Sequence, residues 1–238
     1  MSSLQTWSTT AINLADHADN VIHTDEGARA AGFERALVAG TTVYAYMTHP
    51  LVVAWGTEWL TSGGGELRLR RPVFDGDRVD VTIGTDQQDG DVVVAAEVGG
   101  EPRATLEAWR SVDAPEPRRG EALSTLEVVL DQTHLDYGAR AGDDLGLYAE
   151  QRIAHPVTFA NLANTVFKEN LVTGPWVHVR SRIHHQGTAP IGATIRAESW
   201  LIERFDSRAG ERAIVDMRMY ADDRPVVTIE HEAIIVLP

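Results

Sequence analysis

Imidazole and carboxylate side chains gather near the start of the chain, in and just before residues 18–40, ADNVIHTDEGARAAGFERALVAG. His23 lies four positions after Asp19, and Asp16 lies three positions before Asp19. An imidazole beside a carboxylate is typical of general acid–base chemistry, in which a positioned group moves a proton to or from the reacting atoms. The stretch ends at Gly40, where an apolar helical segment begins, and a helix N-terminus attracts negative charge. These residues are the candidates for chemistry in this chain.

The same stretch resembles the pattern of the MaoC-like, (R)-specific enoyl-CoA hydratase group. That pattern reads Asp, any residue, Asn, Pro, Ile or Leu, His, any residue, Asp, then a short helix reaching Gly-Phe, and finally His-Gly at the start of a central helix. The matching residues are Asn20, Ile22, His23, Asp25, Ala28, Gly32, Phe33 and Gly40. The resemblance implies that His23 is the catalytic histidine and that the N–H of Gly40 donates to the thioester oxygen. It also implies that Thr48 lines the acyl pocket.

Three departures fall at important positions of the pattern. Ala18 stands where the pattern has its catalytic Asp, and Ala39 replaces the His of His-Gly. Val21 replaces the proline, so the loop can follow a different path. We therefore predict that Asp19, one position late, is the acid–base partner of His23.

The second half contains a complementary remnant of the pattern in residues 134–148, HLDYGARAGDDLGLY. Asp143 falls at the catalytic Asp position and Tyr148 at the catalytic His position. His155 matches the His of His-Gly, with Pro156 in place of Gly. Neither half keeps an intact dyad, and we interpret these second-half residues as structural.

Both halves show the same order of elements, on either side of a segment rich in proline and charge. Helical stretches at 41–55 and 156–171 are each followed by runs that alternate apolar and polar residues, which is typical of strands. Asp25 is expected to cap a short helix before the first of them. A single helix needs an apolar partner surface, and a curved sheet provides one.

The order predicts an α+β fold, a tandem (double) hotdog in which each half is a curved antiparallel sheet wrapped around a central helix. The expected boundaries are 1–115 for the first hotdog, 116–123 for the linker and 124–238 for a degenerate second hotdog. Joining the two sheets edge to edge would protect exposed strand edges.

Arginines on the predicted strands are candidates for phosphate binding. Alternation places Arg68 and Arg70 on one face, and guanidinium groups suit the phosphates of CoA or of a carrier. Tyr44, on the central helix, is a further candidate substrate contact. The neighbouring His184 and His185 point to opposite faces of a strand, so we predict no metal site.

Composition excludes several classes of function. The chain has 238 residues, no cysteine, one lysine and a net charge of −14. Nucleic-acid binding requires clustered cations, and a membrane span requires about 18 apolar residues, so neither is expected. The N-terminus does not resemble a signal peptide, and we expect a cytoplasmic protein, as a monomeric pseudo-dimer or a homodimer.

The sequence thus favours a lyase, a hydratase or dehydratase of enoyl or 3-hydroxyacyl thioesters on CoA or an acyl carrier. No cofactor is needed, because the thioester itself makes the α-proton acidic. A divergent reaction such as isomerisation or cyclisation would use the same groups. The alternative is a non-catalytic acyl-thioester-binding or assembly subunit, which the substitutions Ala18 and Ala39 favour.

Overall fold

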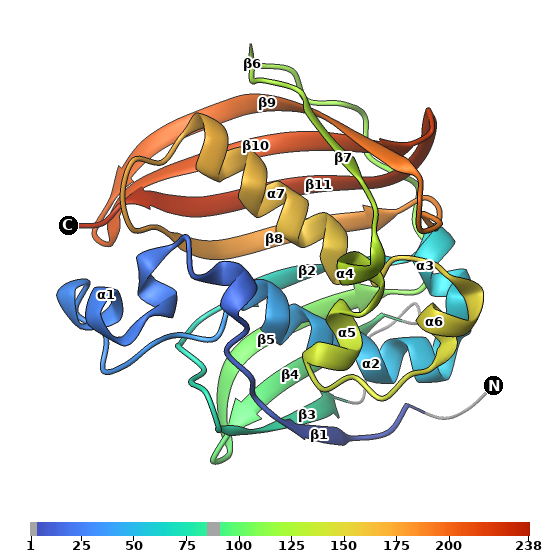
Figure 1. The fold of residues 1–238 in the computed structure, drawn as a ribbon, viewed down its shortest axis with the longest axis horizontal. Coiled ribbons are helices and arrows are strands. Elements are labelled where there is room, and N and C mark those ends of the chain that lie inside the picture. Colours follow the sequence, from blue (N-terminus) through green and yellow to red (C-terminus); the bar gives the residue numbers. More distant parts are fainter. Residues whose placement is uncertain (1–3, 85–90) are drawn as a thin grey trace.

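The computed structural model describes residues 4–84 and 91–238, and its strands form one continuous antiparallel sheet (Figure 1). The strand order is β1-β3-β4-β5-β2-β8-β11-β10-β9-β6, with β7 also paired to β9. The strands are β1 (Trp7–Thr10), β2 (Gly64–Leu69), β3 (Arg78–Gly84), β4 (Val92–Val98), β5 (Glu101–Trp109), β6 (Glu121–Ala122), β7 (Leu126–Val129), β8 (Val177–His185), β9 (Thr194–Ser207), β10 (Gly210–Ala221) and β11 (Arg224–Val236).

Two long helices, α2 and α7, lie on the same face of this sheet and contact each other. Short helices and turns connect them to the strands. The helices are α1 (Asp25–Ala30), α2 (Gly40–Trp55), α3 (Trp59–Ser62), α4 (Gln132–Leu135), α5 (Tyr137–Arg140), α6 (Leu147–Gln151) and α7 (Val157–Asn170), with 3-10 turns η1 (Ala15–His17), η2 (Val21–His23) and η3 (Gly56–Glu58).

The two halves of the sheet repeat one topology. From the centre outwards the first half runs β2, β5, β4, β3, β1, and the second runs β8, β11, β10, β9, β7. The halves join where β2 pairs antiparallel with β8, Leu67 opposite Ser181. Each half places one long helix against its own strands, so the predicted double hotdog is confirmed.

Helix α2 is mostly apolar and mostly buried, with Val53 as its exposed apolar residue. Most of its 16 residues are buried, including Val43, Tyr44 and Leu51. Such a pattern is typical of a core helix rather than a surface helix. It ends at Gly56, whose φ of 68° lies in the left-handed region that favours glycine.

The N-cap of the short helix α1 lies one residue earlier than expected. The cap is Thr24, whose Oγ1 accepts from the N–H of Gly27, and Asp25 is the first helical residue. The Asp25 carboxylate instead accepts from the N–H of Ala36 and pairs with Arg29. Its predicted role as the cap was therefore wrong, although its position at the positive end of the helix is favourable.

The segment between the halves lies against the second half of the sheet. The N–H of Arg118 donates to Asp216, and the Arg118 guanidinium pairs with Glu230. The expected limits of the linker stay a prediction. Within the part of the chain that the structure describes, no helix combines the length and the hydrophobicity that crossing a bilayer requires.

Candidate functional site

A cavity of about 220 Å³ opens at the N-terminus of α2, between the end of β2 and the start of β8; we call it the α2 pocket. Its walls are mainly apolar, with Ile22, Phe33, Leu37 and Val73 among them. A more polar cavity, the polar pocket, lies next to it. His23 lines both, so its imidazole stands where the two cavities meet.

The position of His23 is fixed by the backbone of the preceding residue, Ile22, and by its own ring. The N–H of Leu37 donates to the Ile22 carbonyl at 3.0 Å, and His23 Nδ1 donates to the Leu37 carbonyl at 2.8 Å. In the neutral ring, Nε2 therefore carries the lone pair. Burial lowers the pKa of His23, with the hydrogen bond to Leu37 opposing the shift. The ring is thus neutral near pH 7, as a general base requires.

The carboxylates near His23 in sequence have other partners. Asp19 pairs with Lys168 at 2.8 Å, and its side chain is 74% exposed. Asp16 makes two hydrogen bonds of 2.7 Å to Arg140. Asp19 and His23 both line the polar pocket, but the structure directs the Asp19 carboxylate to the ammonium group of Lys168.

A second imidazole, which the sequence reasoning missed, lies beside His23. The rings of His17 and His23 have centroids 5.7 Å apart. His17 Nε2 is 2.7 Å from the Tyr137 hydroxyl, which is 2.7 Å from the Thr42 hydroxyl on α2. Burial, helped by the neighbouring His23, lowers the pKa of His17 to about 4. The signal was present in the sequence, since His17 precedes the substituted Ala18 directly.

The N-terminus of α2 is open to the α2 pocket. Its cap residue, Ala39, has no side-chain hydrogen bond, and the first helical bond joins the N–H of Val43 to the Ala39 carbonyl. The preceding amides have no partner within the helix. A Cβ at Gly40 would lie 2.2 Å from Leu69 Cδ1 and 3.3 Å from His178 Nδ1. Glycine therefore keeps this end of the helix accessible, as an oxyanion site requires.

The equivalent end of α7 is closed. His155 Nδ1 accepts from the N–H of Val157 at 3.1 Å, and Pro156 has no N–H. His155 Nε2 bonds Asp143 at 3.0 Å, and the Tyr148 ring packs on the imidazole. Asp143, Tyr148 and His155 are all buried. The remnant pattern of the second half thus fills the place that is a cavity in the first half.

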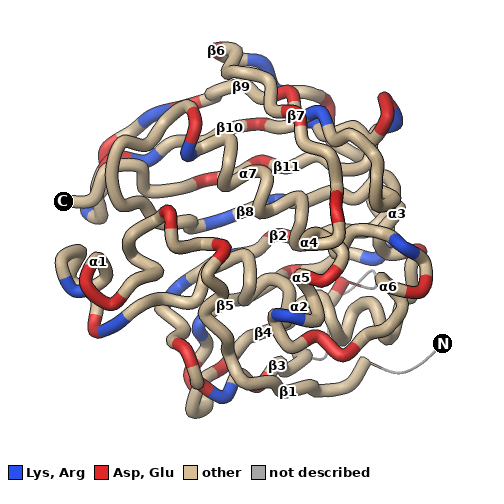
Figure 2. The backbone as a smooth tube through the Cα atoms, in the orientation of Figure 1, with Lys and Arg blue, Asp and Glu red and all other residues tan. Residues whose placement is uncertain are grey.

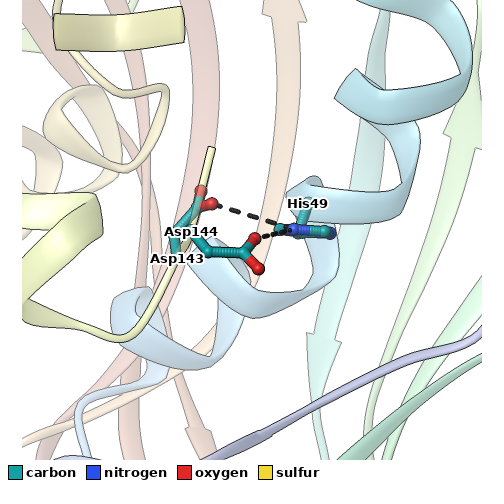
Figure 3. A group of neighbouring side chains, drawn as sticks. All are labelled: His49, Asp143 and Asp144. Atoms are coloured by element: carbon teal, nitrogen blue, oxygen red, sulfur yellow. Dashed lines mark hydrogen bonds and ion pairs between the residues drawn. The ribbon is translucent and has the colours of Figure 1, made fainter. Parts of the chain in front are cut away.

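Asp143 also belongs to a group with the donor types of a metal site. Among the described residues, ligand atoms of His49, Asp143 and Asp144 lie within 4.8 Å of one another (Figure 3). His49 Nε2 bonds Asp144 at 2.7 Å, and Asp143 accepts from the N–H of Leu145 and from His155. These hydrogen bonds connect α2 to the loop before α6, while His49 Nδ1 is buried without a partner among the described residues.

The predicted substrate contacts have different fates. Thr48 and Tyr44 are fully buried in α2 and line neither pocket; Thr48 Oγ1 bonds the Ala45 carbonyl and the Tyr44 hydroxyl lies 3.3 Å from His185. Thr48 is about two helical turns beyond Gly40, too far along α2 to reach this cavity.

The arginine pair is divided. Arg70 lines the α2 pocket, while Arg68 pairs with Glu66 on β2. Arg71, which follows Arg70 in the same arginine-rich run, also lines the pocket, and the sequence reasoning missed two further arginines of its wall, Arg103 and Arg212. Arg71 and Arg103 lie 2.6 and 3.9 Å from Glu101. Cationic side chains therefore surround part of a mostly apolar cavity.

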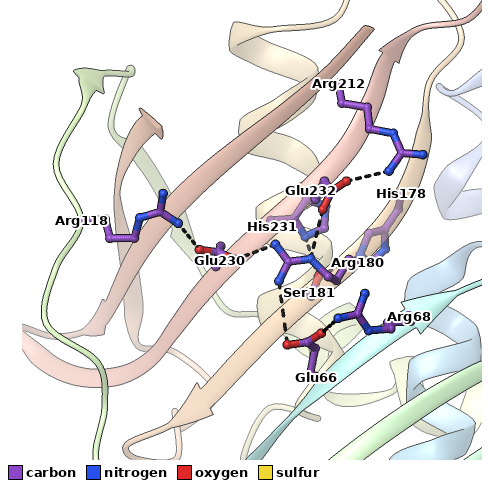
Figure 4. Close-up of polar contacts among 10 residues, drawn as sticks. All are labelled: Glu66, Arg68, Arg118, His178, Arg180, Ser181, Arg212, Glu230, His231 and Glu232. Carbon is purple, nitrogen blue, oxygen red and sulfur yellow. Dashed lines mark hydrogen bonds and ion pairs between the residues drawn. The ribbon is translucent and has the colours of Figure 1, made fainter. Parts of the chain in front are cut away.

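Beyond the pocket, basic residues of β8 face acidic residues of β11 and β2 across the ladder (Figure 2). Arg180 lies 2.6 Å from Glu230 and 3.0 Å from Glu232. These pairs join the strands at the centre of the sheet (Figure 4). Glu66 pairs with Arg68 and also lies 3.9 Å from Arg180. A phosphate bound by Arg68 would therefore have to compete with the Glu66 carboxylate.

Several buried polar atoms of the α2 pocket have no protein partner. Among the described residues, Asn20 Oδ1, Asn164 Oδ1 and His178 Nδ1 are buried and unbonded. Leaving such atoms unpaired is costly, so a cavity that collects them is typical of a ligand site. Asn20 Nδ2 donates to the Trp176 carbonyl, which ties the His23 loop to the second half.

No protein-family model and no curated protein matches the chain by sequence. Solved structures match along nearly its whole length. A protein described as a MaoC domain dehydratase, from Chloroflexus aurantiacus, is 14% identical with a TM-score of 0.64, over 98% of this chain and 95% of that one. A Mycobacterium tuberculosis protein described as a double hotdog is 12% identical with a TM-score of 0.63, over 98% and 96%.

A third match, described as an oleoyl thioesterase from Lactobacillus plantarum, is 10% identical with a TM-score of 0.57, over 99% and 97% of the two chains. At these identities the likeness establishes the fold. MaoC-like dehydratases are among the structural neighbours, in agreement with the resemblance of residues 18–40.

Proposed function

We propose that this chain is a hydratase or dehydratase of enoyl or 3-hydroxyacyl thioesters, with the reaction centre in the α2 pocket. One observation carries the proposal: within the described parts of the chain, a neutral His23 whose Nε2 has no protein partner and the amides at an open helix N-terminus border the same cavity. A general base and an oxyanion site are the two groups that addition of water to a conjugated thioester needs.

The reaction balances with one imidazole. His23 Nε2 takes a proton from water as its oxygen bonds to the β-carbon, and the electron pair of the double bond moves towards the thioester oxygen. The amides at Gly40 stabilise that negative charge. The imidazolium then returns the proton to the α-carbon. Asp19 stays a proposed member of the acid–base site. It lines the polar pocket with His23, but its carboxylate pairs with Lys168.

The proposed carrier is CoA. Arg70, Arg71, Arg103 and Arg212 contribute to the wall of the pocket, and guanidinium groups bind phosphates through paired hydrogen bonds. The net charge of −14 would repel an acidic carrier protein. CoA thioesters also agree with the cytoplasmic location expected from the sequence.

The test is turnover of crotonyl-CoA by the parent chain and by His23→Ala, following loss of the conjugated thioester. His184→Gln is the control, because His184 is a buried imidazole that lines neither pocket. We expect His23→Ala to lower kcat by about 10² to 10⁴-fold, the usual contribution of a general base, and the control to stay near the parent.

Thiol release is measured in the same assay, because the thioesterase among the structural neighbours makes hydrolysis the second candidate reaction. Release of CoA that depends on His23 would replace hydration by hydrolysis. No turnover of crotonyl-CoA, longer enoyl-CoAs or 3-hydroxyacyl-CoAs would reject the enzyme proposal and leave the acyl-binding alternative.

A further inference from the structure

Strand β8 carries a bulge next to the α2 pocket. Arg180 lies opposite Glu232 of β11, but His178 lies opposite Ala233, so β8 holds one extra residue between them. In a regular strand, residues three positions apart point to opposite faces, and a bulge changes this alternation. His178 and Ser181 therefore point to the same face, where their side chains bond at 2.8 Å.

Ser181 links two imidazoles. Its hydroxyl lies 2.8 Å from His178 Nε2 and 2.8 Å from Nδ1 of His231, which is its cross-strand partner on β11 (Figure 4). The two rings stack with centroids 4.1 Å apart. A hydroxyl has one hydrogen, so when it donates to one ring it accepts from the other. The tautomers of His178 and His231 are thus coupled.

The far end of this chain of hydrogen bonds faces the α2 pocket. His178 is only 7% exposed and lines the cavity, and its Nδ1 has no partner among the described residues. Nδ1 lies 3.3 Å from the point that a Cβ of Gly40 would occupy. The imidazole of the second half and the helix N-terminus of the first half therefore converge on one point.

We propose that His178 Nδ1–H is a second hydrogen-bond donor to the thioester oxygen, beside the amides at Gly40. This inference rests on the proposed function of the pocket. A thioester oxygen only accepts hydrogen bonds, so it selects the tautomer in which Nδ1 carries the hydrogen. Ser181 then donates to His178 Nε2 and accepts from His231 Nδ1–H, and both act as positioning residues.

The electrostatics of the rings suit this role. Burial lowers the pKa of His178 to about 3. Burial, together with the nearby His178 and Arg180, lowers the pKa of His231 far below its ordinary value. Both imidazoles are neutral near pH 7. A neutral imidazole N–H stabilises a developing oxyanion without giving up its proton, because it is a very weak acid.

The experiment compares His178→Gln with His178→Asn. The Gln amide can take the place of Nε2 and keep the bond to Ser181, whereas the Asn amide can take the place of Nδ1 and keep a donor in the pocket. Crotonyl-CoA labelled at the thioester carbon is bound to each variant, and the carbonyl stretching frequency is measured by difference infrared spectroscopy. His184→Gln, on the same strand, is the control.

In the parent and the control we expect the carbonyl band of the bound thioester to shift to lower frequency. His178→Gln should lose most of that shift and lower kcat about a hundredfold, with KM within about threefold, because the donor acts on the transition state. His178→Asn should recover much of both. Ser181→Ala should give a smaller loss of band shift and of kcat. It leaves the His178 ring in place but no longer holds it in the tautomer with hydrogen on Nδ1.

A folded His178→Gln variant with an unchanged band and an unchanged kcat overturns the inference while leaving the proposed function intact. If the parent binds crotonyl-CoA without hydrating it, the carbonyl band of the bound thioester can still be measured. A shift of that band that depends on His178 then supports the inference, although the proposed hydratase activity is rejected. A parent that binds no acyl-CoA overturns both. If His178→Gln does not fold, the loss of band shift in Ser181→Ala decides the question.

Discussion

His23 combines two properties that a structural histidine does not need together. Its Nδ1 is held by the Leu37 carbonyl, and its Nε2 stands at the junction of two cavities. Among the described residues Nε2 has no protein partner, and the ring is only partly buried, so Nε2 can meet a ligand or water in the cavities. The open Nε2 is what distinguishes His23 from His155, both of whose ring nitrogens are bonded.

The pH dependence of kcat/KM follows from the same ring. Since burial lowers the pKa of His23 below its ordinary 6.5, the neutral, active form is already dominant near pH 7. Hydration should therefore rise as pH increases through a midpoint below 6.5 and should then be constant. The profile is measured from about pH 5 to pH 8, with the folded fraction followed by circular dichroism. A midpoint above pH 7 would contradict this assignment.

The sequence predicted His23 itself better than it predicted the residues that surround its ring. His23 and Gly40 were predicted to act together, and the structure places both on the α2 pocket. Asp19 was predicted because it lies one position after the catalytic Asp of the pattern. Its partner Lys168 is 149 positions away, and no local pattern reveals such a contact. The ring of His17 lies 5.7 Å from that of His23, although the pattern of the resemblance gives His17 no role.

At the scale of elements, the two central helices differ at one end. The N-terminus of α2 is kept open by Gly40, while that of α7 is closed by His155 and the buried Asp143. Because the N–H of Val157 donates to His155 Nδ1, the hydrogen of the neutral ring is on Nε2 and is donated to Asp143. The remnant motif has thus become a cap for α7, and its hydrogen bonds stabilise the fold.

His155→Ala should therefore lower stability and spare activity, the reverse of His23→Ala. The substitution leaves one oxygen of the buried Asp143 without its donor, and we expect a loss of about 2 to 4 kcal/mol in the free energy of unfolding. Urea denaturation measures this loss, and kcat is measured at a temperature where the variant is folded. A fall in kcat comparable to that of His23→Ala would contradict the structural role of His155 and Asp143.

The elements themselves were largely predictable, and the irregular ones were not. The helix expected at 41–55 is Gly40–Trp55, and the one expected at 156–171 is Val157–Asn170, because long apolar runs bounded by turns leave few alternatives. The bulge in β8 is different. It depends on pairing with β11, about 50 positions later, and regular alternation gave no reason to place His178 in the site.

At the scale of the whole molecule, the fold encloses many neutral imidazoles in its sheet. His178, His184, His185 and His231 are buried. Burial, the largest cause at each, lowers the pKa of His178 and His185 to about 3 and that of His184 to about 4, and it lowers that of His231 well below its ordinary value. Their unfolded pKa is about 6.5, so the unfolded chain binds protons that the folded chain rejects.

The protein should therefore lose stability between about pH 6.5 and pH 5, before most carboxylates titrate. Where the unfolded state binds more protons, the free energy of unfolding falls as pH falls, and each buried histidine contributes at most about 1.4 kcal/mol per pH unit. The urea midpoint, measured across this window, should drop steeply. His17, whose pKa burial also lowers to about 4, adds a fifth group, so His184→Gln should reduce the slope by about a fifth. A midpoint that stays constant over the window would mean that these imidazoles reach solvent and take up protons in the folded state.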